Sequence, residues 1–410
     1  MKKKWLLIFT ITFMVSYSFA GGFQVNLQGQ KQTGMGHTGT GLLLDNACIL
    51  FNPGAMSFLD SLQSVGIGGS FIFPRISFLD PTSGYKTETV HHTGTPITLY
   101  TVLKTKKTSK WNFGLGVYNP FGSLVQYQDD WKGQFLLREI NLKTFFIQPT
   151  VSVKLSDKVG LGLGLIYAFG DFSLRQAVPL QFTNGTYGEA RLNGKASGYG
   201  FNAGIYYKAN QKLSIGIDYR SQVSVKVSNG TADFTVPSSV ANYFPTTTFS
   251  TNLRLPSTLT VGFGYALNNK LKLALDINYV AWKSYDTLSI DFADNTDQLK
   301  DIHSPRCYHN AFIFRLGGQY QISPMWALRL GSYFDMTAAD AGYLTPETPD
   351  ENKLGITAGA TLKIANKFFL DLSMLYIEGM KRTDTNLEKN FTGTYKERAV
   401  VPGLGLSYVF

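Results

Sequence analysis

Apolar residues alternate with small or polar residues along many segments of this 410-residue chain. From Leu259 to Leu267 the odd positions are Leu, Val, Phe, Tyr and Leu, whereas the even positions between them are Thr, Gly, Gly and Ala. The same alternation recurs over residues 159–169, 213–220 and 271–279. Because successive side chains of a strand point to opposite faces, this period of two predicts β-strands with one apolar face.

Alternation alone also fits a soluble β-sandwich, in which the exposed faces carry many Lys and Glu residues. Here the second face consists of Gly, Ser, Thr, Asn and a few charges, as expected for the lumen of a membrane barrel. Charged residues make up only 16% of the chain, below the ~25% of soluble domains. After residue 20 no stretch approaches the ~18 consecutive apolar residues of a spanning helix. A membrane protein with this sequence must therefore cross as a closed barrel.

The connections between the predicted strands alternate between short and long. The short ones fall at residues 106–110, 156–158, 210–212, 268–270, 322–325 and 365–367. The long ones cover residues 80–94, 120–142, 176–194, 227–250, 285–309, 338–352 and 381–396. Short periplasmic turns and long extracellular loops are typical of bacterial outer-membrane barrels, and this count predicts an all-β antiparallel barrel of about 14 strands.

The two ends of the chain agree with an exported barrel. Three lysines, an apolar stretch over residues 5–19 and the small residues Ser18 and Ala20 predict a signal peptide over residues 1–20. The alternative, an uncleaved anchor, would need about 20 apolar residues. At the other end, an alternating strand finishes on Phe410, which is how bacterial barrels typically close.

Residues 21–60 do not follow the strand pattern. They are rich in Gly, Asn and Gln, and three interpretations are open: a disordered tail, a periplasmic linker, or a plug folded into the barrel. The apolar residues of 42–51 argue against a solvated tail. A barrel of 14 strands is wide enough to leave a lumen unless something fills it. We therefore predict a plug over 21–60 and a transmembrane barrel over 61–410.

Charge and reactive side chains exclude several function classes. The net charge of +10 falls to +7 (10 − 3) without the three signal lysines, and it is scattered, which does not fit nucleic-acid binding. The only two cysteines, Cys48 and Cys307, are far apart and are expected to be free. Neither a CxxC pair nor an HExxH motif is present, so we expect neither a metal site nor a cofactor. None of the five histidines has a recognisable catalytic spacing with Ser and an acid, which argues against an enzyme such as a lipase.

Several motifs, in this order and spacing, closely resemble the FadL/TodX family of outer-membrane transporters for hydrophobic compounds. They are Gly21–Asn26, Gly34–Gly36, Asp45–Met56, Leu255–Ser257, Asp276–Tyr285, Arg315–Gly317 and Trp326–Gly331, followed by a loop with Thr345–Pro346 and Pro349–Asp350. The resemblance covers essentially the whole mature chain. It implies a 14-stranded barrel plugged by an N-terminal hatch, with ligand captured at extracellular loops, passed to a tighter pocket and released sideways into the membrane beside a kinked strand.

The segment that matches the kink consists of Asn119, Pro120, Phe121 and Gly122. Pro120 lacks a backbone donor and Gly122 has no side chain to pack, so pairing with a neighbouring strand should fail there. The family resemblance then implies that these four residues form a lateral gate. The alternative is that the strand ends at Tyr118 and the four residues open the next loop.

Three groups of residues are candidates for ligand binding. The hatch turn Phe51, Asn52 and Pro53 either closes the floor of the pocket or only tethers the plug. Gly21, Gly22 and Phe23 begin the predicted mature chain, which the resemblance places near the ligand. By alternation Arg315 and Arg329 point into the lumen, where they could hold a carboxylate or pair with Asp276, Asp335 or Asp371.

The leading hypothesis is passive uptake of long-chain fatty acids. Uptake of aromatic or alkane hydrocarbons is the alternative within the family, and it would need a pocket without a cation. A barrel that serves protein secretion or surface attachment is the alternative from another class. The expected partners are a hydrophobic small molecule, outer-membrane lipid and lipopolysaccharide, and the expected oligomeric state is a monomer.

Overall fold

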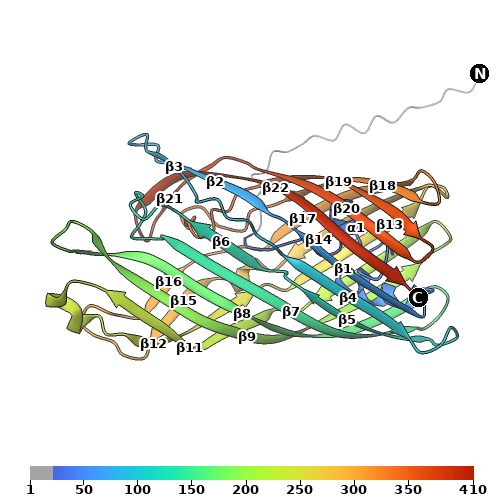
Figure 1. Ribbon diagram of the computed structural model, residues 1–410, viewed down its shortest axis with the longest axis horizontal. Coiled ribbons are helices and arrows are strands. Elements are labelled where there is room, and N and C mark those ends of the chain that lie inside the picture. Colours follow the sequence, from blue (N-terminus) through green and yellow to red (C-terminus); the bar gives the residue numbers. More distant parts are fainter. Residues whose placement is uncertain (1–21) are drawn as a thin grey trace, which may run out of the picture.

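The computed structural model describes residues 22–410. The predicted signal peptide and Gly21 lie outside the described residues. The described part of the chain forms one antiparallel sheet of 22 strand segments, shown in Figure 1. Within it, no helix is long and apolar enough to cross a membrane.

Fourteen strands close a ring, which confirms the predicted class and strand number. In order around the barrel they are β1 (Gln63–Ser70), β4 (Ile97–Lys104), β5 (Trp111–Tyr118), β7 (Glu139–Lys154), β8 (Val159–Gln181), β9 (Tyr187–Lys208), β10 (Leu213–Arg220), β13 (Thr258–Ala266), β14 (Leu271–Val280), β17 (Ala311–Gln321), β18 (Trp326–Asp335), β19 (Lys353–Ala365), β20 (Phe368–Gly379) and β22 (Phe391–Val409). The ring closes because β1 pairs with both β4 and β22.

The remaining segments extend the wall at the end opposite the C-terminus, as Figure 1 shows for β3, β11, β12, β16 and β21. They are β2 (Phe73–Leu79), β3 (Lys86–Glu88), β6 (Gly122–Gln126), β11 (Val223–Thr235), β12 (Thr247–Leu255), β15 (Thr287–Phe292), β16 (Ile302–Pro305) and β21 (Arg382–Asn386). All six predicted short turns join consecutive ring strands at the other end.

The predicted long loops are partly wrong, because several of them are paired strand. The stretch 176–194 is mostly the ends of β8 and β9, which stay paired, with one register shift between Val178 and Gln181, down to a short turn at 182–186. The outward row of β8 changes from Tyr167 and Phe169 to Asp171, so its apolar alternation ends there. Backbone pairing does not need apolar side chains, and it continues beyond the apolar band.

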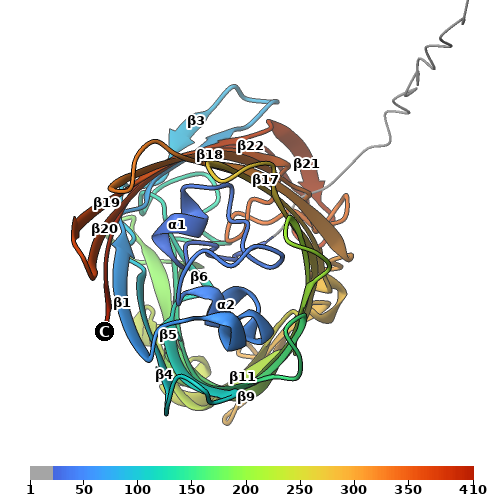
Figure 2. The ribbon, with the colours of Figure 1, turned by 90° about the vertical axis from the view of Figure 1, so that its right-hand side faces the viewer.

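Residues 22–62 precede the first ring strand, and most of them lie inside the ring, as Figure 2 shows for α1 (Gln30–Thr33) and α2 (Cys48–Phe51). A 3-10 helix, η1 (Pro53–Phe58), follows α2; two more, η2 (Ser238–Tyr243) and η3 (Trp282–Ser284), lie in connections of the wall. We call residues 22–59 the hatch. Cys48 is buried within it and, like Cys307, is free, as predicted.

Polar groups of the wall hold the hatch backbone. On β14, the Asp276 carboxylate accepts hydrogen bonds from the backbone N–H groups of Gly39 (2.9 Å) and Thr40 (3.0 Å). On β10, a Cβ added to Gly216 would lie 1.8 Å from the carbonyl oxygen of Thr40. The glycine therefore stands where the hatch backbone touches the wall, and the carboxylate satisfies donors that would otherwise be buried without a partner.

Candidate functional site

A cavity of about 480 Å³ lies between the start of the hatch and the barrel wall. Its lining includes hatch residues 22–27, the stretch 92–97 before β4, the kink beyond β5, and inward-facing residues of β19, β20 and β22. The apolar part of the lining includes Phe23, Phe121, Leu375 and Val401. Its size and largely apolar lining are typical of a small-molecule site.

The wall is irregular where β5 ends and β6 begins. Phe121 forms a lone antiparallel bridge with Gln24 of the hatch. The N–H of Val25 donates to Pro120 O (2.8 Å) and the N–H of Gly122 donates to Phe23 O (3.1 Å). The hatch therefore takes the pairing that the strand would otherwise offer to its neighbour in the wall.

Asn119 connects the two strands on either side of this kink. Its Oδ1 accepts a hydrogen bond from the N–H of Ile97 at the start of β4 (3.0 Å), and its Nδ2 donates to Thr144 O on β7 (2.7 Å). The hydroxyl of Thr144 donates to Phe121 O (2.5 Å). One amide side chain thus replaces the missing backbone pairs, which lets the chain bend without leaving buried groups unsatisfied.

The cavity reaches from the lumen to the outer face of the wall at this kink. Its lining includes Val401, which faces the lumen, and also Ile97, Lys143 and Phe145, which stand at outward positions of β4 and β7. Ile97 is 50% exposed. A molecule in the cavity can therefore contact both the hatch and the lipid side of the barrel.

Phe23 anchors the hatch beside the kink. Its ring centroid lies 6.1 Å from that of Phe121, 5.1 Å from that of Trp282 and 5.5 Å from that of Tyr285, all with edge-to-face geometry. Trp282 is fully buried and also contacts Phe121. Aromatic pairs of this kind each add about 0.5–1.5 kcal/mol beyond the area they bury. Movement of Phe23 would therefore disturb the kink directly.

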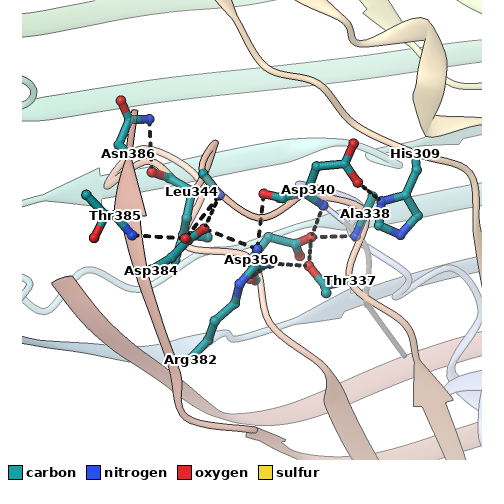
Figure 3. Close-up of polar contacts among 12 residues, drawn as sticks. His309, Thr337, Ala338, Asp340, Leu344, Asp350, Arg382, Asp384, Thr385 and Asn386 are labelled. Atoms are coloured by element: carbon teal, nitrogen blue, oxygen red, sulfur yellow. Dashed lines mark hydrogen bonds and ion pairs between the residues drawn. The ribbon is translucent and has the colours of Figure 1, made fainter. Parts of the chain in front are cut away.

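The polar end of the cavity is built around Asp350, in the connection between β18 and β19. Its carboxylate accepts hydrogen bonds from the hatch N–H of Gly22 (2.9 Å), from the N–H groups of Ala338 (2.7 Å) and Ala339 (3.2 Å), and from the Thr337 hydroxyl. Figure 3 shows Asp350 with Thr337 and Ala338. Burial raises the pKa of the Asp350 carboxyl above its ordinary value.

Arg382 of β21 binds the connection between β18 and β19, which contains Asp350. Its guanidinium donates to the backbone oxygens of Asp350 (3.0 Å) and Asp340 (3.2 Å) and pairs with Asp384 at 3.3 Å (Figure 3). The extracellular connection that covers the cavity is thus tied both to the wall and, through Asp350, to Gly22 at the start of the hatch.

One half-buried lysine belongs to the lumen side of the cavity lining. Lys353, at the start of β19, forms a 2.7 Å ion pair with Glu397 of β22. Another lining carboxylate, Glu347, lies 3.4 Å from Arg306. Lys353 and Glu347 are therefore each engaged in an ion pair with another residue of the chain.

The structure brings only some of the predicted site residues to this cavity. Gly22, Phe23, Asn119, Phe121 and Gly122 line it, and Pro120 accepts the hydrogen bond from Val25. Gly21 lies outside the described residues.

The other candidates lie elsewhere in the lumen. Phe51, Asn52 and Pro53 are buried deeper in the hatch, where the Asn52 amide donates to Thr40 O (3.0 Å) and Ile205 O (2.9 Å). Asn52 thus ties two hatch segments to β9, as in the tethering interpretation.

The two arginines do not line the cavity either. Arg315 donates to His37 O (3.2 Å) and stands directly opposite Asp276 in the sheet register. Arg329 donates to Gln319 (2.8 Å) and Thr361 (2.7 Å). Both guanidinium groups serve contacts within the plugged lumen.

Sequence reasoning missed Lys353, Glu397 and Asp350. Alternation could have assigned an inward position to Lys353 and Glu397, but their pairing joins strands 44 positions apart in the sequence (397 − 353). Asp350 falls in a predicted loop, and no local motif marks it as a partner of the hatch.

Comparisons with known proteins agree with this architecture. A family model described as outer membrane protein transport protein (OMPP1/FadL/TodX) matches residues 11–410. The 47 kDa outer membrane protein of Pasteurella multocida is 23% identical over 99% of this chain and 98% of its own length. The long-chain fatty acid transport protein of Escherichia coli K12 is 21% identical over 90% of both chains.

Two solved structures show the same fold. A FadL homologue of Pseudomonas aeruginosa superposes with a TM-score of 0.82 at 18% identity, over 95% of this chain and all of the other. The toluene transporter TodX of P. putida superposes with a TM-score of 0.73 at 17% identity, over 92% of this chain and 97% of the other. At these identities the structural matches establish the architecture.

Proposed function

Because the chain belongs to the OMPP1/FadL/TodX family of outer-membrane transport proteins, we propose that it takes up long-chain fatty acids through its plugged barrel. The barrel lies in the outer membrane of a Gram-negative bacterium. In this proposal the ligand occupies the cavity beside Phe23 and leaves sideways at Asn119–Gly122. No catalytic step is part of it.

The observation that carries the proposal is the cavity lining, which joins lumen-facing Val401 to outward-facing Ile97 and Phe145. Each CH₂ group of a fatty acid costs about 0.8 kcal/mol to move from an apolar environment into water. An open aqueous pore would expose the whole alkyl chain, whereas a side exit through the wall keeps it among apolar groups. Lateral release therefore suits an alkyl chain better than a straight path through the lumen.

Lys353 is the candidate partner of the fatty-acid carboxylate, because it is the lumen-side lysine of the cavity lining. It is already paired with Glu397 at 2.7 Å, so a ligand carboxylate has to compete with a built-in one. This observation favours aromatic or alkane hydrocarbons as the second candidate cargo, since they need no cation.

Uptake of labelled oleate and of labelled toluene by cells that lack their own transporters would test both cargoes. We expect oleate uptake to rise with this protein and to fall to background when Asn119–Gly122 is replaced by a regular alternating strand. Pro402→Val, which removes a proline from the outward face of β22, is the matched control and should keep uptake. Lys353→Met should reduce oleate uptake and leave toluene uptake unchanged.

Each result bears on a different part of the proposal. Toluene uptake without oleate uptake would assign the hydrocarbon cargo. Failure to take up either compound, with heat-modifiable migration showing a folded barrel, would contradict the transport proposal. Uptake that is unchanged in the kink variant would contradict the lateral exit.

A further inference from the structure

Three neighbouring strands carry an apolar band on their outer faces that ends abruptly in charge. On β22 the outward row contains Leu406, Leu404 and Val400 and then Arg398. On β2 the exposed Phe73 is followed two positions later by Arg75. On β20 the exposed Leu372, Met374 and Tyr376 are followed by Glu378. Figure 1 shows these strands side by side in the wall.

The charged step lies at the extracellular edge of the membrane. From Tyr408 to Val400 the outward row of β22 covers eight residue steps, which is a rise of about 20 Å at about 3.3 Å per residue and a strand tilt near 40°. This height approaches the ~25 Å apolar band of outer-membrane barrels. Because the short turns mark the periplasmic end, Arg398 stands at the level of the outer-leaflet head groups.

Like charges stand directly opposite each other in this charged step. Arg75 stands directly opposite Arg398 in the antiparallel register of β2 and β22, and both side chains are exposed on the outer face. One step higher on the same face, Lys396 stands opposite Ser77. Side chains directly opposite each other in a sheet are about 5 Å apart at Cβ, where like charges are destabilising.

One carboxylate shares these cations. Glu378 lies 2.6 Å from Lys396 and 3.0 Å from Arg398. The other carboxylate on this face, Glu88, stands opposite Ser77 and is 3.9 Å from His91. Arg75 has no side-chain hydrogen bond or ion pair with any residue in the stretch 22–410. We call Arg75, Glu378, Lys396 and Arg398 the outer basic cluster, with a formal charge of +2 (3 − 1).

The same level elsewhere on the barrel shows a different arrangement. On the exposed outer faces of β7, β8 and β9, Lys143 stands opposite Asp171, and Asp171 stands opposite Lys195. Opposite signs alternate there, as cross-strand pairing favours. In the outer basic cluster, Glu378 stands opposite Arg398 and compensates it, whereas Arg75 stands beside a like charge with no carboxylate partner among residues 22–410. An anion from outside the chain would compensate it.

We propose that the outer basic cluster binds a phosphate of lipid A, the anchor of lipopolysaccharide in the outer leaflet. Two guanidinium groups can each hold phosphate oxygens with paired hydrogen bonds, and Lys396 adds a third cation. The acyl chains of the same molecule would lie along the exposed Leu404, Met374 and Phe73 below the cluster. The site requires only that the barrel lies in the outer membrane, and it is independent of which cargo is transported.

Binding can be measured on the purified, folded barrel in detergent by titration with bisphosphorylated lipid A, monitoring the temperature at which heat-modifiable migration is lost. We expect lipid A to raise this temperature for the wild type. The double variant Arg75→Gln/Arg398→Gln should bind at least tenfold more weakly. The matched control Lys195→Gln/Lys226→Gln, which also removes two exposed outward cations from β9 and β11, should keep wild-type affinity.

A second variant tests the sign of the electrostatics. Glu378→Gln removes the competing carboxylate and should tighten lipid A binding, whereas a purely structural role for the ion pairs would lower stability without improving affinity. Equal affinity of the wild type and the double arginine variant would overturn the proposal. A shift of the same size with inorganic phosphate alone would also overturn it, because the acyl chains would then contribute nothing.

Discussion

Gly216 offers a direct test of how the hatch is held. An alanine Cβ at this position would lie 1.8 Å from the carbonyl oxygen of Thr40 and 2.7 Å from the amide nitrogen of Asn52. The strand cannot move away, since β10 is paired along its length with both β9 and β13. In Gly216→Ala the hatch must therefore shift away from the wall.

The cost can be estimated from the contacts that are lost. Inserting a methyl group into a well-packed interior costs about 1–3 kcal/mol. The 3.0 Å hydrogen bond from Asn52 to Thr40 O would break as well, at about 0.5–1.5 kcal/mol. A total of about 1.5–4.5 kcal/mol corresponds to a shift of roughly 10- to 2,000-fold in the equilibrium between seated and displaced hatch.

The control is another glycine of a ring strand. A Cβ added to Gly69 on β1 would meet nothing closer than 3.6 Å, so Gly69→Ala changes the same residue type without a collision. We expect Gly216→Ala, and not Gly69→Ala, to sensitise cells to a bulky antibiotic and to expose the hatch to protease in the purified barrel. Identical permeability and proteolysis in the two variants would refute the reasoning.

Two further predictions concern the cavity. Phe23→Ala removes the aromatic anchor, at about 3–5 kcal/mol for a buried phenylalanine, and should lower ligand affinity and uptake; Phe113→Ala, on the 46% exposed lipid side of β5, should not. Burial, together with the carboxylate of Glu397, raises the pKa of Glu351 to about 8 from an ordinary 4.5. The free energy that Glu351 contributes to holding loop 336–352 closed is thus fully present below about pH 4.5. It is lost as the pH rises through about 8, because the buried carboxyl must then ionise. Hydrogen exchange of this loop should speed up over that range in the wild type and become less pH-dependent in Glu351→Gln; equal pH dependence in both would contradict this.

The sequence by itself determined the barrel, its strand number and its six short turns. Alternation is a local property of a strand, and the lipid side demands apolar residues at every second position, as in Leu259, Val261 and Phe263. The turn residues between the strands are equally local. The sequence also located the break at Pro120, because proline removes a backbone donor wherever it stands.

Only the tertiary structure decided what each lumen-facing residue meets. Alternation identifies Arg315 as inward, yet it does not say that the guanidinium is used by His37 O. In the same way, the Lys353–Glu397 pair and the contact of Gly216 with Thr40 join segments far apart in the chain. These contacts depend on how the strands close into a ring and where the hatch lies within it, and no local pattern of residues encodes that arrangement.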